Sequence, residues 1–255
     1  IFRYSFPPAL PNRSHSRTRK MESVADIKNA FASKRLHIVS IEANLGSGKS
    51  TLLNRISAAD PVELLGCTDV HVEVLHEPLD KVGNLLDLFY ADKARWAFTL
   101  QMVFFLSRVS ESIERIGAAL RNPRHLDKRI LFVIERSVYA DMECFVKMLH
   151  AASLLSDIEY AAYTDRFDWS VVVPLSAIVH LQVLPEECFR RMRKRDRATE
   201  REVELSYLQA LSDQHDTWLA SSSYRGIPIV RCDGNAALDQ VFDNLTRILQ
   251  SVLEP

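Results

Sequence analysis

A short segment in the first quarter of the chain carries the strongest chemical signal. Residues 43–51 follow an apolar run and read Ala-Asn-Leu-Gly-Ser-Gly-Lys-Ser-Thr. This matches the pattern G-x-x-x-x-G-K-[ST], with Ala43 in place of the first glycine. In such a segment, backbone N–H groups and a helix N-terminus surround phosphates, the lysine adds a positive charge, and the serine hydroxyl can ligate Mg²⁺. The pattern predicts a site for a nucleoside triphosphate (ATP or another NTP) and Mg²⁺, formed by Asn44, Gly46, Ser47, Gly48, Lys49, Ser50 and Thr51.

Ala43 is a departure that the backbone conformation can test. If a positive φ is needed at this position, an alanine is strained by about 1 kcal/mol or more. A chance Gly/Ser turn is the alternative interpretation of the segment. The strand-like run before it and the helix-like run after it favour a phosphate site.

Two carboxylates directly follow other strand-like apolar runs. Glu77 precedes Pro78, and Glu135 precedes Arg136. A carboxylate opposite a phosphate loop can accept a proton from an attacking hydroxyl, which suits Glu77. A carboxylate on the neighbouring strand usually serves Mg²⁺, which suits Glu135, while Arg136 can keep Glu77 ionised. A common strand-end Glu-Pro pair and a surface ion pair are the ordinary structural alternatives.

A long amphipathic segment, residues 95–120, carries two polar side chains on one face. Gln101 and Arg108 lie seven residues apart, which is two helical turns. Phe104 and Phe105 lie between them. An amide can pair with the edge of a base and aromatic rings can stack on it, although polar pairs on such helices are often only solvated.

A basic run follows a predicted helix that begins at Pro185. Arg191 and Arg195 are four residues apart and share a helix face, and Arg197 and the acidic Glu200 follow. A basic segment of this kind can close over a triphosphate and supply charge to the transition state. A solvated charge run or a nucleic-acid patch are the alternatives, and the nearby acidic residues weaken the second.

The elements that must position these residues alternate along the chain. Short β-rich runs are separated by longer helical patterns, which predicts a parallel sheet covered by helices on both faces. We therefore expect a three-layer α/β/α fold with a five-stranded parallel sheet and function at the carboxyl ends of its strands. The expected strands are 36–41, 70–75, 129–134, 177–183 and 227–231, and the expected helices are 95–120, 185–194, 203–220 and 238–253.

Bulk composition limits the classes of function. The chain has 255 residues, is 47% hydrophobic and carries a net charge of −1. It therefore has no strong field to attract a nucleic-acid polymer or an anionic membrane. No apolar run reaches the ~18 residues of a membrane span. The four cysteines are scattered, with neither zinc-site nor disulfide spacing.

The amino-terminal segment differs from the rest of the sequence. Residues 1–20 contain five basic residues and no acidic ones, which is typical of an organelle transit peptide. Upstream sequence before Met21 explains the composition equally well. We expect residues 1–33 to form a basic, disordered extension and residues 34–255 to form one domain that contains the phosphate site. The compartment is then cytoplasmic or mitochondrial.

Taken in order, these segments resemble the deoxyribonucleoside kinase family, which includes deoxycytidine, deoxyguanosine and mitochondrial-type thymidine kinases. The resemblance covers roughly residues 36–253, and its ordered combination of motifs is far more specific than any one of them. The matching stretches are 41–50, 77–78, 95–101, 106–108, 135–141 and 185–188, followed by the arginine-rich lid and by 218–219.

The resemblance implies a role for each candidate residue. Glu77 is similar to the family's general base, Arg136 to its partner at the reacting oxygen, and Glu135 to the acid linked to Mg²⁺. Tyr90 and Glu200 match the pair that holds the sugar 3′-hydroxyl. Family members are usually homodimers and act on a small deoxynucleoside with an NTP donor. The remaining matches are Gln101 with the base and Arg191, Arg195 and Arg197 over the phosphates.

Arg108 and Asp141 bear on the choice of base. Family members that accept deoxycytidine or purine deoxynucleosides are similar in having an arginine and an aspartate there, because a charged pair can meet an exocyclic amino group and crowds a thymine methyl. Val82 and Arg231 depart from the family's usual Trp and Asp, which leaves the width of the pocket and the phosphate donor open. A nucleoside monophosphate kinase and a non-catalytic nucleotide-binding subunit are the alternatives.

Overall fold

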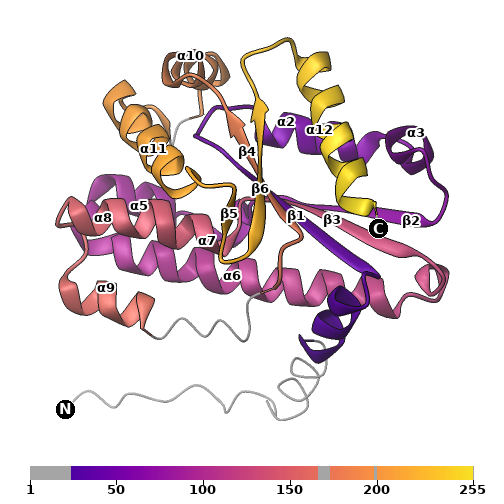
Figure 1. Cartoon of the computed structure of the whole chain (residues 1–255). Coiled ribbons are helices and arrows are strands. Elements are labelled where there is room, and N and C mark those ends of the chain that lie inside the picture. Colours follow the sequence, from indigo (N-terminus) through magenta and orange to yellow (C-terminus); the bar gives the residue numbers. More distant parts are fainter. Residues whose placement is uncertain (1–23, 166–172, 198–199, 255) are drawn as a thin grey trace, which may run out of the picture.

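The computed structural model describes residues 24–165, 173–197 and 200–254, and its centre is a twisted sheet (Figure 1). The strand order is β2-β3-β1-β4-β6-β5. The five predicted strands are all present and pair in parallel. A sixth strand, β5, pairs antiparallel with β6 and has only two residues, too few for a periodic signal. The strands are β1 (Leu36–Glu42), β2 (Val70–Leu75), β3 (Arg129–Glu135), β4 (Ala177–Gln182), β5 (Ser223–Tyr224) and β6 (Ile227–Asp233).

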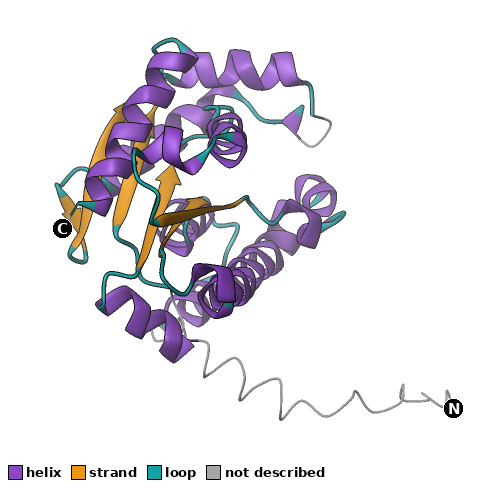
Figure 2. Cartoon of the chain, turned by 90° about the vertical axis from the view of Figure 1, so that its right-hand side faces the viewer, coloured by secondary structure: helices purple, strands orange, loops and turns teal. Residues whose placement is uncertain are grey.

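Helices cover both faces of the sheet, so the predicted three-layer α/β/α architecture is confirmed (Figures 1 and 2). The helices before the lid are α2 (Lys49–Ala58), α3 (Pro61–Leu65), α4 (Leu79–Val82), α5 (Leu85–Ala91), α6 (Lys93–Arg121) and the 3₁₀ turn η1 (Pro123–His125). After β3 come α7 (Val138–Ala140), the π-helical η2 (Asp141–Val146), α8 (Lys147–Ala151) and α9 (Asp157–Thr164). The remaining helices are α10 (Pro185–Arg195), α11 (Leu205–Trp218) and α12 (Leu238–Leu253).

Alternation along the strands divides the core into two clusters. Ile38 and Phe132 point to one face, while Val39 and Leu131 point to the other, as a period of two requires. The first face is covered mainly by α6, η2 and α9, and the second by α2, α3, α10 and α12. Every residue of β1 is buried, because this strand lies between β3 and β4 under both layers.

The folded part of the chain begins before the expected boundary at residue 34. Residues 24–32 are helical. Ile27 and Ala30 of this helix are 2% and 8% exposed and belong to the first core cluster. The expected disordered extension of residues 1–33 therefore reaches too far toward the carboxyl end of the chain. A helix shorter than three turns has too few apolar positions for its periodicity to be recognised in the sequence. Residues 1–23 lie outside the described residues.

The helices of the described residues do not combine the length and apolar character that a membrane-spanning segment needs.

Parallel pairing brings the ends of β1, β2, β3, β4 and β6 to one edge of the sheet. Ile41 near the end of β1 lies opposite Glu135 at the end of β3. The phosphate-loop candidate leaves β1, and Glu77 follows β2, the strand beyond β3. The phosphate loop, Glu77 and Glu135 therefore lie at one edge of the sheet although they are far apart in sequence.

Candidate active site

The loop between β1 and α2 has the backbone shape of a phosphate cradle at two glycines. Gly46 and Gly48 have φ of 71° and 95°. A Cβ on Gly46 would lie 2.4 Å from the carbonyl oxygen of Cys188 on α10, so close packing also requires a glycine there. Ala43 is 1% exposed and is not among the described residues with positive φ. The replacement of the first motif glycine therefore causes no backbone strain.

Lys49 lies at the start of α2 and folds back over this loop. Its Nζ donates to the carbonyl oxygens of Asn44 at 2.8 Å and Ala43 at 3.2 Å, and lies 3.4 Å from Ser47 Oγ. Burial and the nearby charge of Arg136 lower the pKa of Lys49 to about 8. The amide of Asn44 donates to Leu208 O at 2.7 Å and so ties the loop to α11.

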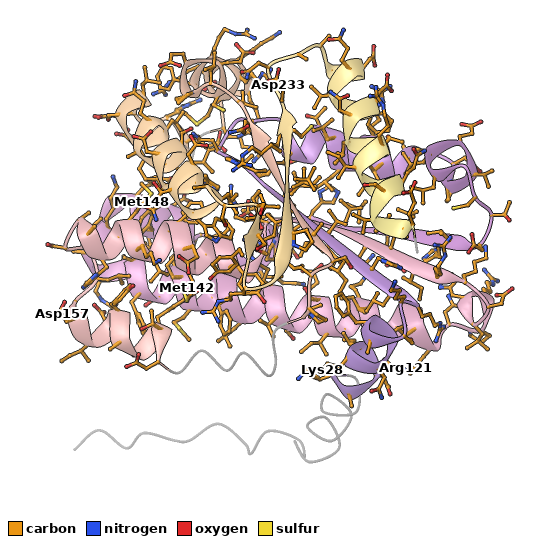
Figure 3. All side chains as sticks on the ribbon, viewed as in Figure 1. Lys28, Arg121, Met142, Met148, Asp157 and Asp233 are labelled. Atoms are coloured by element: carbon orange, nitrogen blue, oxygen red, sulfur yellow. The ribbon has the colours of Figure 1, made fainter. Side chains whose placement is uncertain are left out.

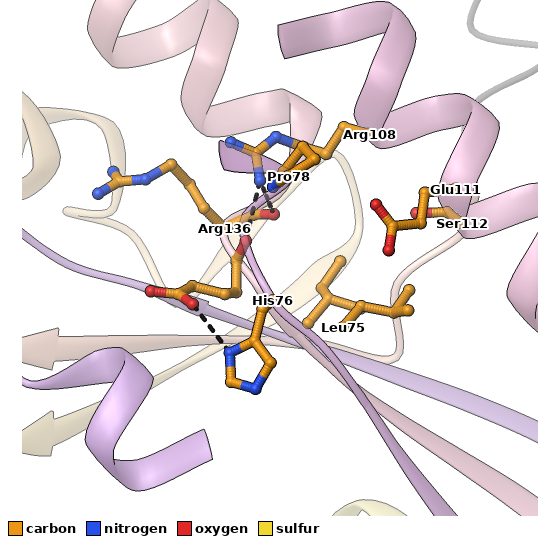
Figure 4. A pocket seen from close by; sticks show the side chains of 9 residues that line it. Leu75, His76, Pro78, Arg108, Glu111, Ser112 and Arg136 are labelled. Atoms are coloured by element: carbon orange, nitrogen blue, oxygen red, sulfur yellow. Dashed lines mark hydrogen bonds and ion pairs between the residues drawn. The ribbon is translucent and has the colours of Figure 1, made fainter. Parts of the chain in front are cut away.

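Glu135 joins the loop to the end of β2. Its Oε1 accepts a hydrogen bond of 2.7 Å from Ser50 Oγ, and its Oε2 lies 3.3 Å from His76 Nδ1 (Figure 4). The backbone N–H of Glu77 also donates to Oε2, at 3.4 Å. A hydroxyl and a carboxylate beside a phosphate loop are the hard oxygen ligands that suit Mg²⁺. Thr51, predicted with this group, is exposed on the first turn of α2.

Glu77 lies among three positive charges. Arg108 Nη2 donates to its Oε1 at 3.0 Å, and Arg136 Nε lies 3.5 Å from the same oxygen. Burial acts to raise the pKa of Glu77, but the charges of Arg136, Arg108 and Lys49 outweigh it and leave the pKa below its usual value. The Glu77 carboxylate is therefore ionised at neutral pH.

Arg108 is 7% exposed and connects several parts of the site. It forms a two-pronged pair with Asp141, at 2.9 Å from Nε and 3.3 Å from Nη2. Its Nη1 donates to the carbonyl oxygens of Glu135 and Arg136 at 2.9 and 3.1 Å. Burial raises the pKa of Asp141, against the opposing effect of Arg108. Figure 4 shows Arg108 and Arg136 at a small hollow that Glu111 of α6 also lines.

Three other predicted contact residues lie around this cluster. Gln101 is 5% exposed on α6, two turns before Arg108. Tyr90 on α5 is half-buried, and burial together with the charge of Glu200 raises the pKa of its hydroxyl to about 12. The charge of Glu200 therefore acts on the Tyr90 hydroxyl, while the binding of a sugar 3′-hydroxyl by this pair stays a prediction.

The three lid arginines have different partners. Arg191 Nη1 donates to Ser47 O in the phosphate loop at 3.1 Å. Its Nη2 lies 3.4 Å from Gly234 O, just after Asp233 at the end of β6 (Figure 3). Arg195 instead pairs with Glu200 at 2.6 Å, and Arg197 lies 3.7 Å from the same carboxylate. Among the described residues, Arg191 therefore contacts the phosphate loop, whereas Arg195 and Arg197 contact Glu200.

The two other departures from the family pattern have structural roles. Val82 is 5% exposed at the end of α4. Arg231 donates to the carbonyl oxygens of Leu219 and Ala220, at 2.8 and 2.7 Å. Its charge therefore satisfies acceptors just beyond the carboxyl end of α11, which is a favourable place for a cation.

Two residues that sequence reasoning did not single out also contact the site. His76 orients the Glu135 carboxylate, and its position directly before Glu77 was the only available signal. Glu42 ends β1 and accepts a hydrogen bond from the backbone of Ser137. A single acidic residue at the end of an apolar run was the signal for Glu42.

Comparison with known proteins agrees with this geometry. The family model described as deoxynucleoside kinase matches residues 39–254. Deoxycytidine kinase 2 of Gallus gallus is 32% identical over 83% of this chain and 86% of its own length. The mitochondrial deoxyguanosine kinase of Xenopus laevis is 30% identical over 82% of this chain and 83% of its own. Deoxycytidine kinase of Homo sapiens is 28% identical over 86% of this chain and 92% of its own length.

Proposed function

Because the chain belongs to the deoxynucleoside kinase family, we propose that ATP donates its γ-phosphate here to the 5′-hydroxyl of deoxycytidine or a purine deoxynucleoside. One observation carries the proposal most directly. The ionised carboxylate of Glu77 lies between Arg108 and Arg136, at the sheet edge that also holds the phosphate loop. A base for a hydroxyl acceptor is therefore next to the site where the triphosphate binds.

The proposed reaction uses Glu77 as the general base. Its carboxylate takes the proton of the 5′-hydroxyl as the hydroxyl oxygen attacks the γ-phosphorus. The bond from the γ-phosphorus to the β–γ bridging oxygen breaks, and ADP leaves with that bond's electron pair. Arg136 lies beside Glu77 and stabilises the charge that spreads over the transferring group.

The donor phosphates occupy the loop between β1 and α2. Lys49 exchanges its loop carbonyl partners for phosphate oxygens, and Arg191 already contacts this loop from α10. Ser50 and Glu135, which are hydrogen-bonded to each other, would hold Mg²⁺ by their hydroxyl and carboxylate oxygens. When bound, Mg²⁺ neutralises charge on the triphosphate.

The acceptor's sugar and base occupy the space between α5, α6 and η2. Tyr90 and Glu200 hold the 3′-hydroxyl, and Gln101 pairs with the base edge. Arg108 and Asp141 favour bases with an exocyclic amino group over thymine, and their buried pair supports this preference. The relatives are a deoxycytidine kinase and a deoxyguanosine kinase, and their names support the same substrate classes.

Two further expectations follow from the family. We propose a homodimer that acts in nucleotide salvage, and sedimentation of the purified protein tests the oligomeric state. The cytoplasmic or mitochondrial location depends on residues 1–20, and imaging of the full chain with and without them tests it.

The direct test is an acceptor screen. Purified protein receives Mg-ATP and each of the four deoxynucleosides or, in a parallel reaction, deoxycytidine monophosphate, and formation of the monophosphate or diphosphate is followed. We expect turnover of deoxycytidine, deoxyadenosine or deoxyguanosine and little of thymidine. No turnover of any deoxynucleoside contradicts the proposal, whereas turnover of deoxycytidine monophosphate alone indicates a nucleoside monophosphate kinase. A preference for thymidine contradicts the roles of Arg108 and Asp141.

The base assignment has its own test. Glu77→Gln should lower kcat about 100-fold or more, since it removes the proton acceptor, while ATP affinity measured by calorimetry stays near that of the wild type. Glu111→Gln is the matched control, because Glu111 is a nearby carboxylate on α6 without a proposed role. A fully active Glu77→Gln enzyme refutes the assignment.

A further inference from the structure

The turn after β3 holds Arg136 in an unusual backbone conformation. Its φ is 64°, in the left-handed region that residues with a Cβ avoid. Such a conformation is strained and persists only where surrounding contacts impose it. Arg136 is also 1% exposed, so this strain lies at the buried centre of the proposed site.

Hydrogen bonds do not fix the orientation of the Arg136 guanidinium. Its three nitrogens have no hydrogen-bond partner among the described residues. Among the described residues, it has an ion-pair contact of 3.5 Å from Nε to Glu77 Oε1 and a cation–π contact with Phe145, whose ring centre is 4.7 Å from the guanidinium carbon. The direction of this side chain therefore depends on the backbone turn from which it leaves.

Neighbouring β1 contacts the turn on both sides of the Arg136 residue. The N–H of Arg136 donates to Ile41 O at 3.2 Å. The N–H of Ser137, the next residue, donates to Glu42 Oε1 at 2.8 Å. The acceptor of the second hydrogen bond is a side chain, so this bond depends on the residue type at position 42.

Glu42 is costly to bury at this position. It is 0% exposed, and its Oε2 has no hydrogen-bond partner among the described residues. Burial raises the pKa of Glu42, against the opposing effects of Ser137 and Arg136. The buried apolar residues of β1 are Leu36, Ile38, Val39 and Ile41, and packing alone gives no reason for a carboxylate at the end of this strand. Its hydrogen bond to the strained turn supplies such a reason.

We propose that Glu42 is a positioning residue, whose bond to the Ser137 N–H maintains the left-handed turn that directs Arg136 at Glu77. This inference rests on the proposed phosphoryl transfer for its effect on rate. Arg108 supports the turn from the other side through the carbonyl oxygens of Glu135 and Arg136. Glu42 therefore acts through Arg136 and does not touch the reacting atoms.

The first test compares Glu42→Ala with Glu42→Gln. The alanine variant loses the acceptor of the Ser137 N–H, and we expect kcat to fall about tenfold or more because the charge beside Glu77 is displaced. KM for ATP should stay within about twofold, since the phosphate loop is untouched. The glutamine variant keeps an acceptor oxygen and should retain kcat within about threefold.

The pH profile separates positioning from general damage. Arg136 contributes to the lowered pKa of Glu77. In Glu42→Ala the acid limb of kcat/KM should therefore move to higher pH, and it should return in Glu42→Gln. Val39→Ala is the matched control, because Val39 is a fully buried residue of the same strand whose sheet partners, Val133 and Ala177, lie outside the turn. It should lower the melting temperature and leave kcat and the acid limb unchanged.

Three results would overturn the inference. The first is wild-type kcat and acid limb in folded Glu42→Ala, and the second is an equal loss of kcat in Val39→Ala. If Glu42→Ala does not fold, Glu42→Asp, which withdraws the carboxylate by one methylene, is compared with Glu42→Gln. The third result is a fully active Glu42→Asp variant together with an inactive Glu42→Gln variant. This result would mean that the site needs a negative charge at position 42, and not only a hydrogen-bond acceptor for the Ser137 N–H.

A structural measurement keeps this inference separate from the proposed function. Failure of the wild type with every deoxynucleoside overturns the proposed function by itself. Crystal structures of the wild type and of Glu42→Ala then decide the positioning role. We expect the Arg136 peptide to leave the left-handed region in the variant, and an unchanged turn contradicts the inference.

Discussion

At the scale of single residues, the candidate site is a cluster of largely buried carboxylates and guanidinium groups that pair with one another. Two carboxylates, Glu77 and Asp141, face the guanidinium of Arg108, and Glu77 also faces Arg136. Removing one member of such a group leaves its partner buried and uncompensated, which costs more than the pair itself contributes. Each substitution therefore needs a control that keeps the remaining charges paired.

Lys49 provides a pH-dependent prediction at this scale. Its pKa is lowered to about 8, so the free enzyme loses this positive charge as the pH rises through about 8. The charged form attracts phosphates, and we therefore expect the Kd for ATP to increase between pH 7 and pH 9. Calorimetric titration across this range measures the effect.

Lys49→Met is the control for this titration, because it has no ammonium group to lose. Its ATP affinity should be weaker at every pH and should lack the change near pH 8. An equal pH dependence in Lys49→Met would assign the effect to another group.

At the scale of elements, the phosphate loop depends on how closely α10 packs against it. A Cβ at Gly46 would meet the Cys188 carbonyl at 2.4 Å, and Arg191 of the same helix contacts Ser47 O. The lid helix and the loop are therefore one packed unit in this conformation. A change in one is expected to disturb the other.

Gly46→Ala tests this packing against a matched control, Gly66→Ala. The two glycines have φ of 71° and 70°, so both substitutions carry the same backbone strain. A Cβ on Gly66, at the end of α3, would meet nothing within 4 Å. We expect Gly66→Ala to lower the free energy of unfolding by about 1 kcal/mol, from strain alone.

Gly46→Ala should lower the free energy of unfolding further and also weaken ATP binding, because α10 and its lid arginines must move. Chemical denaturation and calorimetry measure the two effects. Equal losses in the two variants, with unchanged ATP affinity, would show that the contact with Cys188 is unimportant.

At the scale of the whole molecule, a helix before β1 completes one face of the core. Ile27 of residues 24–32 packs in the cluster that also contains Ile38 and Phe132. The cluster continues into α6 and η2, which carry Arg108 and Asp141. This helix therefore supports the layer that holds the proposed base-recognition pair.

Ile27→Ala should lower the free energy of unfolding by about 2–4 kcal/mol, because it leaves a cavity in a packed core. Lys28→Ala is the control, since Lys28 is the exposed neighbour on the same helix (Figure 3). It should change stability by less than about 0.5 kcal/mol. Equal stability of the two variants, measured by denaturant unfolding, would mean that this helix does not contribute to the core.

The sequence by itself determined the features that are written in consecutive residues. The five parallel strands and the phosphate-loop pattern were predictable because alternation, apolar runs and glycine positions are local. Parallel pairing also followed, since alternating strands and helices favour parallel strands with their carboxyl ends at one edge, whereas the strand order came from the structure. β5 and the helix at residues 24–32 were not predicted, because they are short or depend on packing partners.

Only the tertiary structure decided how the site residues meet. Arg108 is 31 residues from Glu77 and 33 from Asp141, yet its guanidinium binds both carboxylates. The left-handed turn at Arg136 and its bond from Ser137 to Glu42 depend on the register between β1 and β3. Hydrogen bonds of this kind require atoms from distant segments to lie within about 3 Å. Local residue types do not specify that arrangement, because it is set by packing of the complete sheet and its helices.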